Sequence, residues 1–296
     1  DGSAAIYERF ASEADVPVHI IKQENKGLLQ ARRAGIKAAN GDYFWHVDGD
    51  DGLAIQAMDA VSGIIDEFNP DVVLIGLSES PTFNSLLPGG MPGEERFYSG
   101  ESLNDVRSAF LDGYIPNMVT KIARRSCVDV DSDYSRYGKL QLGEDQLQSL
   151  FLLNSMRSAA CIREPLYFYR HNASITANYC EGRITQYAVV KEAVYRQALE
   201  WDAKWTGHDF AETALAGYLS NGFYDMRKNV GVKWYQRQFQ EFRNTSLYAS
   251  AITHRKSLRL EQRVFFDFLE RKSDILAYWC LLCCRATTPL VRRTAR

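Results

Sequence analysis

Three aspartates crowd the end of a short apolar run. Asp48, Asp50 and Asp51 follow directly on segment 42–47, DYFWHV, which is rich in aromatic residues. Carboxylates a few ångströms apart repel one another by about 1 kcal/mol or more, so a cation is expected to join them. Mn²⁺ or Mg²⁺ binds one or two carboxylates together with substrate phosphates. The pattern predicts such a metal and a phosphorylated ligand, with a solvated acidic turn as the alternative. An EF-hand is excluded, because the fifth position from Asp48 is Gly52.

Strands and helices are predicted to alternate around this run. Apolar periodicity and stop signals place strands at 16–23, 42–47 and 71–77, and helices at 3–14, 25–40 and 53–69. Such alternation is typical of an α/β protein with a mostly parallel sheet flanked by helices. Ligands of such sheets bind outside the carboxyl ends of the strands, which is where the three aspartates are expected.

The remainder of the chain divides into a loop, a second α/β group and a helical half. Segment 78–100 is rich in Pro, Gly, Ser and Asn and is predicted to be a loop. Further predictions are helices at 102–114 and 143–159, a short strand or turn at 119–128, and a strand from 160. From 179 to 272 the pattern is helical and amphipathic. We therefore expect a domain at 1–178 and a helical C-terminal region at 179–296.

Composition limits the classes of function. The 296 residues are 46% hydrophobic and 24% charged, which is ample for a packed core. Because the net charge is −2 and the pI is near 6.3, no overall basic field favours nucleic acid as a partner. The six cysteines follow neither disulfide nor zinc spacing, and the N-terminus lacks a signal pattern. We expect a cytoplasmic protein.

Both ends of the chain carry an expectation of their own. The chain begins with the turn signal Asp1-Gly2-Ser3, so we expect that a strand before Asp1 is missing. Near the other end, segment 275–284 is ten consecutive apolar or weakly polar residues followed by Arg285. Ten residues are about half of a membrane-spanning helix. The alternatives are a segment lying on the inner face of the cell membrane and a helix packed on the protein's own core.

Several short motifs resemble those of the family 2 glycosyltransferases in order and rough spacing. They are DGS at 1–3, the segment 23–51 that ends in HVDGDD, VTKIARRS at 119–126, GEDQL at 143–147 and PLYFYRHNASIT at 165–176. The resemblance is to the bacterial type that builds capsular, exopolysaccharide or lipopolysaccharide glycans. It covers about residues 1–176 and implies a GT-A fold without its first strand. It also implies a nucleotide-diphosphate sugar donor, a divalent cation, and inverting transfer to a hydroxyl of a glycan or lipid-linked acceptor.

The resemblance assigns roles to the acidic residues. Asp145 of the ED motif matches the general base, and Glu144 is the second candidate. Asp50 matches a direct metal ligand, and Asp48 lies nearer the ribose or the same metal. Asp1 matches an acidic turn near the nucleoside.

Four basic residues are weaker candidates. Lys26 and Arg32 could meet the phosphates or the nucleotide, and a solvated helix face is the alternative. Arg170 and His171 could approach the diphosphate or the metal, and a surface loop is the alternative. The family usually has Asn where this chain has Arg33, which leaves that position without an implied role.

Two other functions remain open at the level of sequence. A nucleotidyltransferase can also place acidic metal ligands at strand ends, although no Gly-rich phosphate loop is visible. A non-catalytic glycosyltransferase-like module could bind a partner through the helical half. The intact Asp48, Asp50 and Asp145 argue against that module.

Overall fold

The computed structural model describes residues 2–87, 91–115, 117–128, 130–140, 142–170, 183–201 and 231–283. The strands are β1 (Tyr43–Trp45), β2 (Gly52–Leu53), β3 (Val72–Ser78), β4 (Phe97–Ser99), β5 (Lys121–Arg124) and β6 (Ser158–Phe168). The helices are α1 (Ser3–Glu13), α2 (Leu28–Ala38), α3 (Ala57–Phe68), α4 (Leu103–Leu111), α5 (Glu144–Ser155), α6 (Arg183–Trp201), α8 (Val232–Arg243), α9 (Ser246–Thr253) and α10 (Leu260–Glu270). Residues 274–283 form a further helix, called the tail helix below.

A six-stranded mixed sheet organises the first half of the chain. Its order is β1-β5-β3-β6-β2, and β4 also pairs with β6. β3 runs parallel to β6, whereas β5 runs antiparallel to both β1 and β3, so β1, β3 and β6 share one direction. The short β2 and β4 run against β6. The predicted α/β class is therefore confirmed, and the strands that oppose the common direction are short ones.

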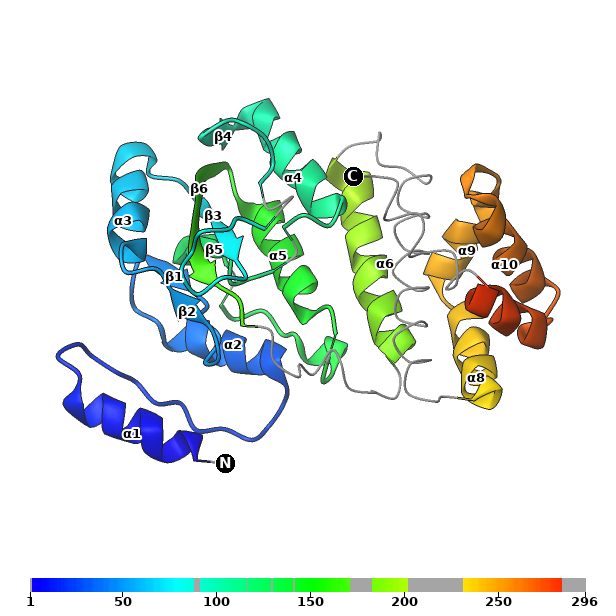
Figure 1. Cartoon of the computed structure of the whole chain (residues 1–296), viewed down its shortest axis with the longest axis horizontal. Coiled ribbons are helices and arrows are strands. Elements are labelled where there is room, and N and C mark those ends of the chain that lie inside the picture. The colour runs from blue at the N-terminus through cyan, green and yellow to red at the C-terminus, as the bar shows by residue number, and fades with distance from the viewer. Residues whose placement is uncertain are drawn as a thin grey trace.

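β3 is the buried centre of this sheet. Val72 and Leu74 belong to one apolar cluster, and Val73 and Ile75 belong to another. The second cluster is completed by α3, while α4 and α5 pack with the first, so helices cover both faces (Figure 1). A strand buried on both faces explains the continuous apolar sequence of segment 71–77.

The strand predicted at 16–23 is wrong. Residues 14–27 carry no regular structure, and Val16, Ile20 and Ile21 are exposed. The β-branched residues give this segment strand propensity, but none of the strands in the described part of the chain pairs with it. The segment follows α1, whose residues are not buried and which lies apart from the sheet in Figure 1.

Helices fill the described part of the C-terminal half. α6 packs along α5, and α8, α9, α10 and the tail helix form the end of the molecule farthest from the sheet (Figure 1). Their interior is aromatic, with Tyr235, Phe239, Phe265 and Phe266 fully buried. The helical prediction for 179–272 is confirmed at 183–201 and 231–272, apart from short connections, and the domain division at 178 stays a prediction.

In the described ranges Cys127, Cys161, Cys280 and Cys283 form no disulfide. Among the helices of the same ranges, none has the length and apolarity needed to cross a bilayer.

Candidate active site

The three aspartates lie on the turn that follows β1. Asp51 donates its backbone N–H to the carbonyl oxygen of Asp48 over 3.2 Å, which closes the turn, and β2 begins at the next residue. Asp50 is exposed at the tip, whereas Asp48 and Asp51 are partly buried. As expected, the carboxylates stand at the carboxyl end of a strand, at an edge open to solvent.

Arg32 joins this turn to the start of α5. Its guanidinium is 6% exposed and donates to Asp145 Oδ1 through Nη1 and to Asp48 Oδ1 through Nη2, the latter over 3.1 Å. The buried guanidinium of α2 thus holds two carboxylates that are 97 positions apart in the sequence. A planar guanidinium suits this task, because its donors diverge in a fixed plane. Arg32 therefore orients acidic residues of the site, a role that the motif comparison did not assign to it.

The first turn of α5 presents Asp145. Gly143 precedes the helix with a φ of +80°, and a Cβ there would lie 3.0 Å from Val190 Cγ2 on α6. Only glycine combines this backbone with so close an approach. The helix begins at Glu144, so Asp145 faces the positive end of the helix dipole. Its second oxygen, Oδ2, accepts the backbone N–H of Met118 at 3.4 Å.

A buried lysine fixes the segment that carries Met118. Lys121 is fully buried, and its Nζ donates to the carbonyl oxygens of Ile115 and Asn117 over 2.7 and 2.5 Å. Burial lowers the pKa of Lys121 to about 7. Trp45 Nε1 donates to the carbonyl of Val119 over 2.7 Å. These bonds hold the backbone of Ile115, Asn117 and Val119 in place beside Met118.

Tyr167 and Arg170 support Asp51 from the end of β6. The Tyr167 hydroxyl donates to Asp51 Oδ2 over 2.6 Å and accepts the backbone N–H of Asp48 over 3.1 Å. Burial and the hydrogen bond to Asp51 raise the pKa of Tyr167 well above its usual value, so the hydroxyl remains a donor. The Arg170 backbone N–H donates to Asp51 Oδ1 over 2.9 Å, and its side chain is exposed. Asp51 thus shapes the turn.

Three further side chains at the acidic edge have shifted pKa values. Burial raises the pKa of Glu144, and Asp48 adds to that rise. Burial, and then the Arg32 charge, lowers the pKa of His46 to about 4, so this imidazole is neutral near pH 7. Burial raises the pKa of Tyr169, with smaller effects from Asp51, Asp50, Asp48 and Glu79. Glu79, at the end of β3, therefore belongs to the same acidic edge.

The structure brings together most of the residues predicted for the site. Asp48, Asp50, Glu144, Asp145, Arg32 and Arg170 gather at this edge. Lys26 is exposed just before α2, and its role stays a prediction. Asp1 and His171 lie outside the described residues. The sequence motifs do not predict Tyr167, Tyr169 and Glu79 as site residues. Their positions at the ends of β6 and β3 are the signal by which the sequence could have indicated them.

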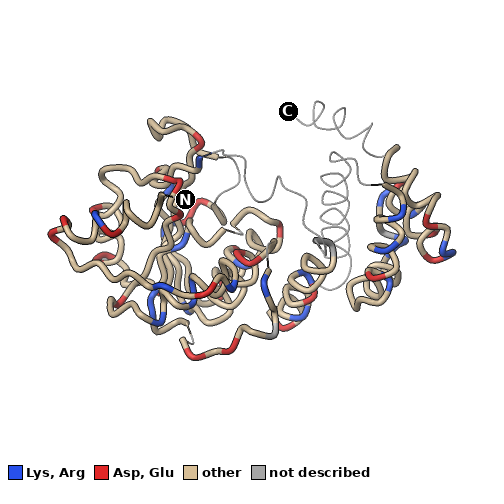
Figure 2. The backbone as a smooth tube through the Cα atoms, turned by 90° about the horizontal axis from the view of Figure 1, so that it is seen from below, with Lys and Arg blue, Asp and Glu red and all other residues tan. Residues whose placement is uncertain are grey.

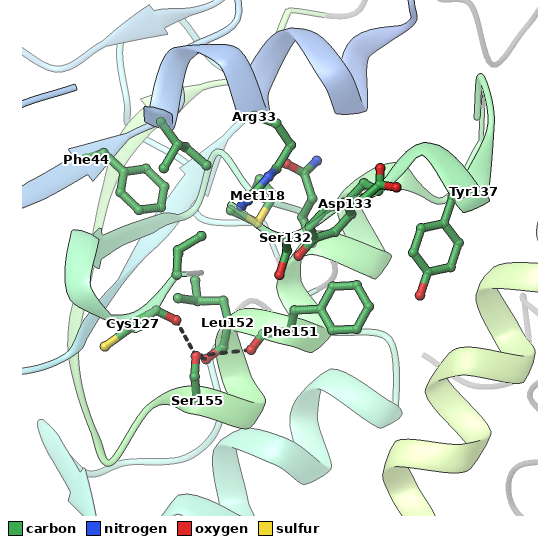
Figure 3. A pocket seen from close by; sticks show the side chains of 14 residues that line it. Arg33, Phe44, Met118, Cys127, Ser132, Asp133, Tyr137, Phe151, Leu152 and Ser155 are labelled. Carbon is green, nitrogen blue, oxygen red and sulfur yellow. Dashed lines mark hydrogen bonds between the residues drawn. The ribbon is translucent and has the colours of Figure 1, made fainter. Parts of the chain in front are cut away.

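A separate cavity of about 360 Å³ lies beside α2 (Figure 3). Arg33 lines it from above, its guanidinium 4.5 Å from the centre of the Tyr134 ring, and Phe44, Phe151 and Leu152 form apolar walls. Asp48, Asp50 and Asp145 do not line this cavity. Arg32 and Arg33 are neighbours on α2, but their side chains lie in different surroundings. Arg32 contacts the carboxylates of the acidic edge, and Arg33 lines the separate cavity.

The acidic edge offers oxygen ligands for a divalent cation. Asp50 is exposed and Asp48 is partly so, and carboxylate oxygens suit Mg²⁺ or Mn²⁺. In the described ranges no three His, Cys, Asp or Glu side chains are arranged to hold a metal by themselves. An ion that takes further ligands from substrate phosphates needs only one or two carboxylates, so the residues present fit such an ion.

Comparison with solved structures identifies the fold. S. aureus TarS 1–349 in complex with UDP-GlcNAc matches with a TM-score of 0.67 at 16% identity, over 97% of this chain and 80% of that chain. The same fragment in complex with UDP gives a TM-score of 0.58 at 15% identity, with the same coverage. The mixed α/β fold with its helical C-terminal region is therefore GT-A-like, the fold class of nucleotide-sugar glycosyltransferases.

Comparison of sequences shows a similarity to one family of enzymes. Residues 1–85 match the model of Glycosyl transferase family 2. The uncharacterized glycosyltransferase EpsJ of Bacillus subtilis (strain 168) is 28% identical over 181 residues, 58% of this chain and 50% of EpsJ. The putative glycosyltransferase EpsH of the same strain is 26% identical over 182 residues, 60% of this chain and 52% of EpsH. The chain spans about half the length of these curated relatives. The resemblance to the family 2 glycosyltransferases that the motifs predict is therefore confirmed as a similarity, over residues 1–85 for the family model.

Proposed function

We propose that this protein is an inverting, metal-dependent glycosyltransferase that moves a sugar from a nucleotide-diphosphate donor to a hydroxyl of a glycan or lipid-linked acceptor. The observation that carries the proposal is the Arg32 bridge, which brings Asp145 of α5 to the Asp48–Asp51 turn. The family match and the relatives named as glycosyltransferases support it. The TarS complex with UDP-GlcNAc makes a UDP-sugar the first donor to test.

Asp145 is assigned the role of general base. It would take the proton of the acceptor hydroxyl while that oxygen attacks the anomeric carbon and the bond from this carbon to the diphosphate oxygen breaks. A base positioned in this way contributes about 10²–10⁴-fold to the rate. A single displacement inverts the configuration at the anomeric carbon. Glu144, the other acid of the ED motif, is the second candidate, and burial raises its pKa.

Asp50 and Asp48 are assigned to the metal and the donor. A bound Mn²⁺ or Mg²⁺ ion neutralises negative charge on a leaving diphosphate. Asp50 would hold it from the exposed tip of the turn, and Asp48, fixed by Arg32, would serve the ribose or the same ion. Lys26, Asp1, Arg170 and His171 remain proposed donor or metal contacts.

Replacing each acid by its amide tests the assignment. Asp145→Asn is expected to lower the rate of UDP release from a UDP-sugar by about 10²–10⁴-fold, and Asp50→Asn to abolish the dependence on Mn²⁺. Glu144→Gln, one position earlier in the same helical turn, is the comparison variant and should lose much less. Asp59→Asn on the exposed face of α3 is the control.

Product analysis decides between this function and its alternatives. Release of nucleoside diphosphate supports sugar transfer, whereas release of pyrophosphate would show a nucleotidyltransferase. If calorimetry detects neither nucleotide-sugar nor metal binding at millimolar concentration, the chain is a binding module and the proposal is wrong.

A further inference from the structure

The tail helix exposes an apolar face at the end of the molecule far from the sheet. Ile275, Leu276 and Trp279 are at least half exposed, and Trp279 reaches 57%. On the opposite side Ala277 and Leu281 are fully buried, and the Tyr278 ring lies 5.2 Å from the Tyr235 ring of α8. The helix is thus anchored by one side and presents large apolar side chains on the other.

α10 extends this face. Cys280 Sγ lies 3.6 Å from the carbonyl oxygen of Glu261, which sets the start of α10 beside the end of the tail helix. Leu260, the first residue of α10, is 66% exposed. We call Leu260, Ile275, Leu276 and Trp279 the tail patch. Exposed apolar side chains grouped in this way mark an interaction surface.

Positive charge flanks the tail patch. Arg271 and Lys272 are exposed at the start of the tail helix, and Arg259 is exposed beside Leu260. Residues 285–296 add four arginines and no acidic residue to the sequence.

The acidic side chains near the patch are largely engaged. Asp274 accepts from Arg243 over 2.6 Å, and Glu270 is paired with Arg255. Glu261 is exposed beside Leu260 and is outnumbered by the cations. Both signs therefore occur on these helices, as Figure 2 shows, but the border of the patch is net positive.

We propose that the tail patch docks on the surface of an anionic lipid bilayer. Leu, Ile and Trp side chains enter the interface between headgroups and acyl chains, and neighbouring Arg and Lys meet anionic headgroups. The apolar run at 275–284 is ten residues, about half of what is needed to span a hydrocarbon core, so we expect this segment to lie in the interface. This proposal goes beyond sugar transfer and holds whether or not the acidic edge is catalytic.

Charge favours a bilayer over a second copy of the chain. A twofold dimer formed through this face would bring the patch, with its net positive border, against its own copy. Those like charges would repel, whereas an anionic bilayer attracts them. Self-association through the patch is therefore the competing outcome in the experiment.

Co-sedimentation with vesicles is the test. The full chain should bind vesicles of phosphatidylcholine with 30% phosphatidylglycerol at least tenfold more strongly than pure phosphatidylcholine vesicles, and the difference should shrink at high salt. Leu276→Ser combined with Trp279→Ser should lower binding at least tenfold. Phe10→Ser on α1 removes an aromatic side chain of similar exposure, 59%, and should leave binding unchanged. Equal loss in both variants would overturn the proposal.

A second measurement separates docking from misfolding. Trp279→Phe retains an apolar side chain and should bind as the wild type does. Quenching of tryptophan fluorescence by brominated lipid should nevertheless fall markedly in this variant, because Trp279 is the ring placed in the bilayer. Unchanged quenching, or concentration-dependent dimers in light scattering without vesicle binding, would show that the patch does not meet lipid.

Discussion

The acidic edge and the C-terminal helical end are built from different interactions. At the edge, Arg32, Tyr167 and backbone N–H groups hold carboxylates in place, and much of each carboxylate remains accessible. At the helical end, aromatic rings such as Phe239 and Phe265 pack at centroid distances near 5.7 Å and are fully buried. Directional bonds fix the positions of charges, whereas aromatic burial supplies stability with less demand on geometry. We therefore expect that different substitutions can change the geometry of the site and the stability of the fold separately.

The largest effect is expected for Phe265→Ala. Removing this ring leaves a cavity and should lower the free energy of unfolding by about 3–5 kcal/mol. Binding of a nucleotide sugar at the acidic edge should be unchanged, since the ring lies in the other region. Guanidinium denaturation and calorimetry measure the two quantities. Leu260→Ala on the same helix is the exposed control, with a change within about 0.5 kcal/mol. A loss of nucleotide affinity in Phe265→Ala would break the proposed separation.

Arg32→Met should lower both the free energy of unfolding and the affinity for the nucleotide sugar. The variant leaves Asp48 and Asp145 without their guanidinium, and their side chains are 35% and 25% exposed, so water offsets part of the penalty. We expect a loss of about 2–3 kcal/mol in stability, together with weaker donor binding. The matched control is Lys37→Met on the same helix, because the Lys37–Asp131 pair is well exposed and should contribute at most about 1 kcal/mol. If Arg32→Met behaves like that control, the bridge does not organise the edge.

His46 gives the edge a pH dependence of its own. Its pKa falls from 6.5 in the unfolded chain to about 4 in the folded one, so on acidification the unfolded state takes up the proton first. Stability should therefore decline as the pH falls from about 6.5 to 4, with about 2–3 kcal/mol from this residue. His46→Phe should lack that part of the decline in denaturation curves recorded across this range. Parallel curves for both proteins would contradict the assignment.

The smallest effect is expected for Tyr167→Phe. The change removes the hydroxyl that contacts Asp51 and the Asp48 backbone, at a cost of about 1–1.5 kcal/mol. Because the turn loosens, donor affinity should fall more clearly than stability does. Tyr114→Phe at an exposed position is the control. Equal donor affinity in both variants would mean that the turn holds its shape without Tyr167.

Local pattern predicted the helices and the central buried strand far better than it predicted the pairing of strands. The apolar run at 71–77 and the helix opened by Glu144 appear as expected, because burial decides their state. The segment 16–23 has the same β-branched character, yet it forms no strand, since pairing depends on a neighbour that sequence does not reveal. Asp51 illustrates the same limit within the site, because the hydrogen bonds to its carboxylate come from residues more than a hundred positions away.

The sequence by itself determined which residues carry charge and at which strand and helix ends they stand. Asp48 and Asp50 could be named because strand ends follow from local periodicity, whereas Asp145 could be named only through the resemblance to the family's ED motif. Only the tertiary structure decided that Arg32 joins Asp48 to Asp145, that Tyr167 closes the turn, and that the tail helix buries one face and exposes the other. These features depend on how segments far apart in the sequence pack against one another. That packing decides toward which neighbour each side chain points.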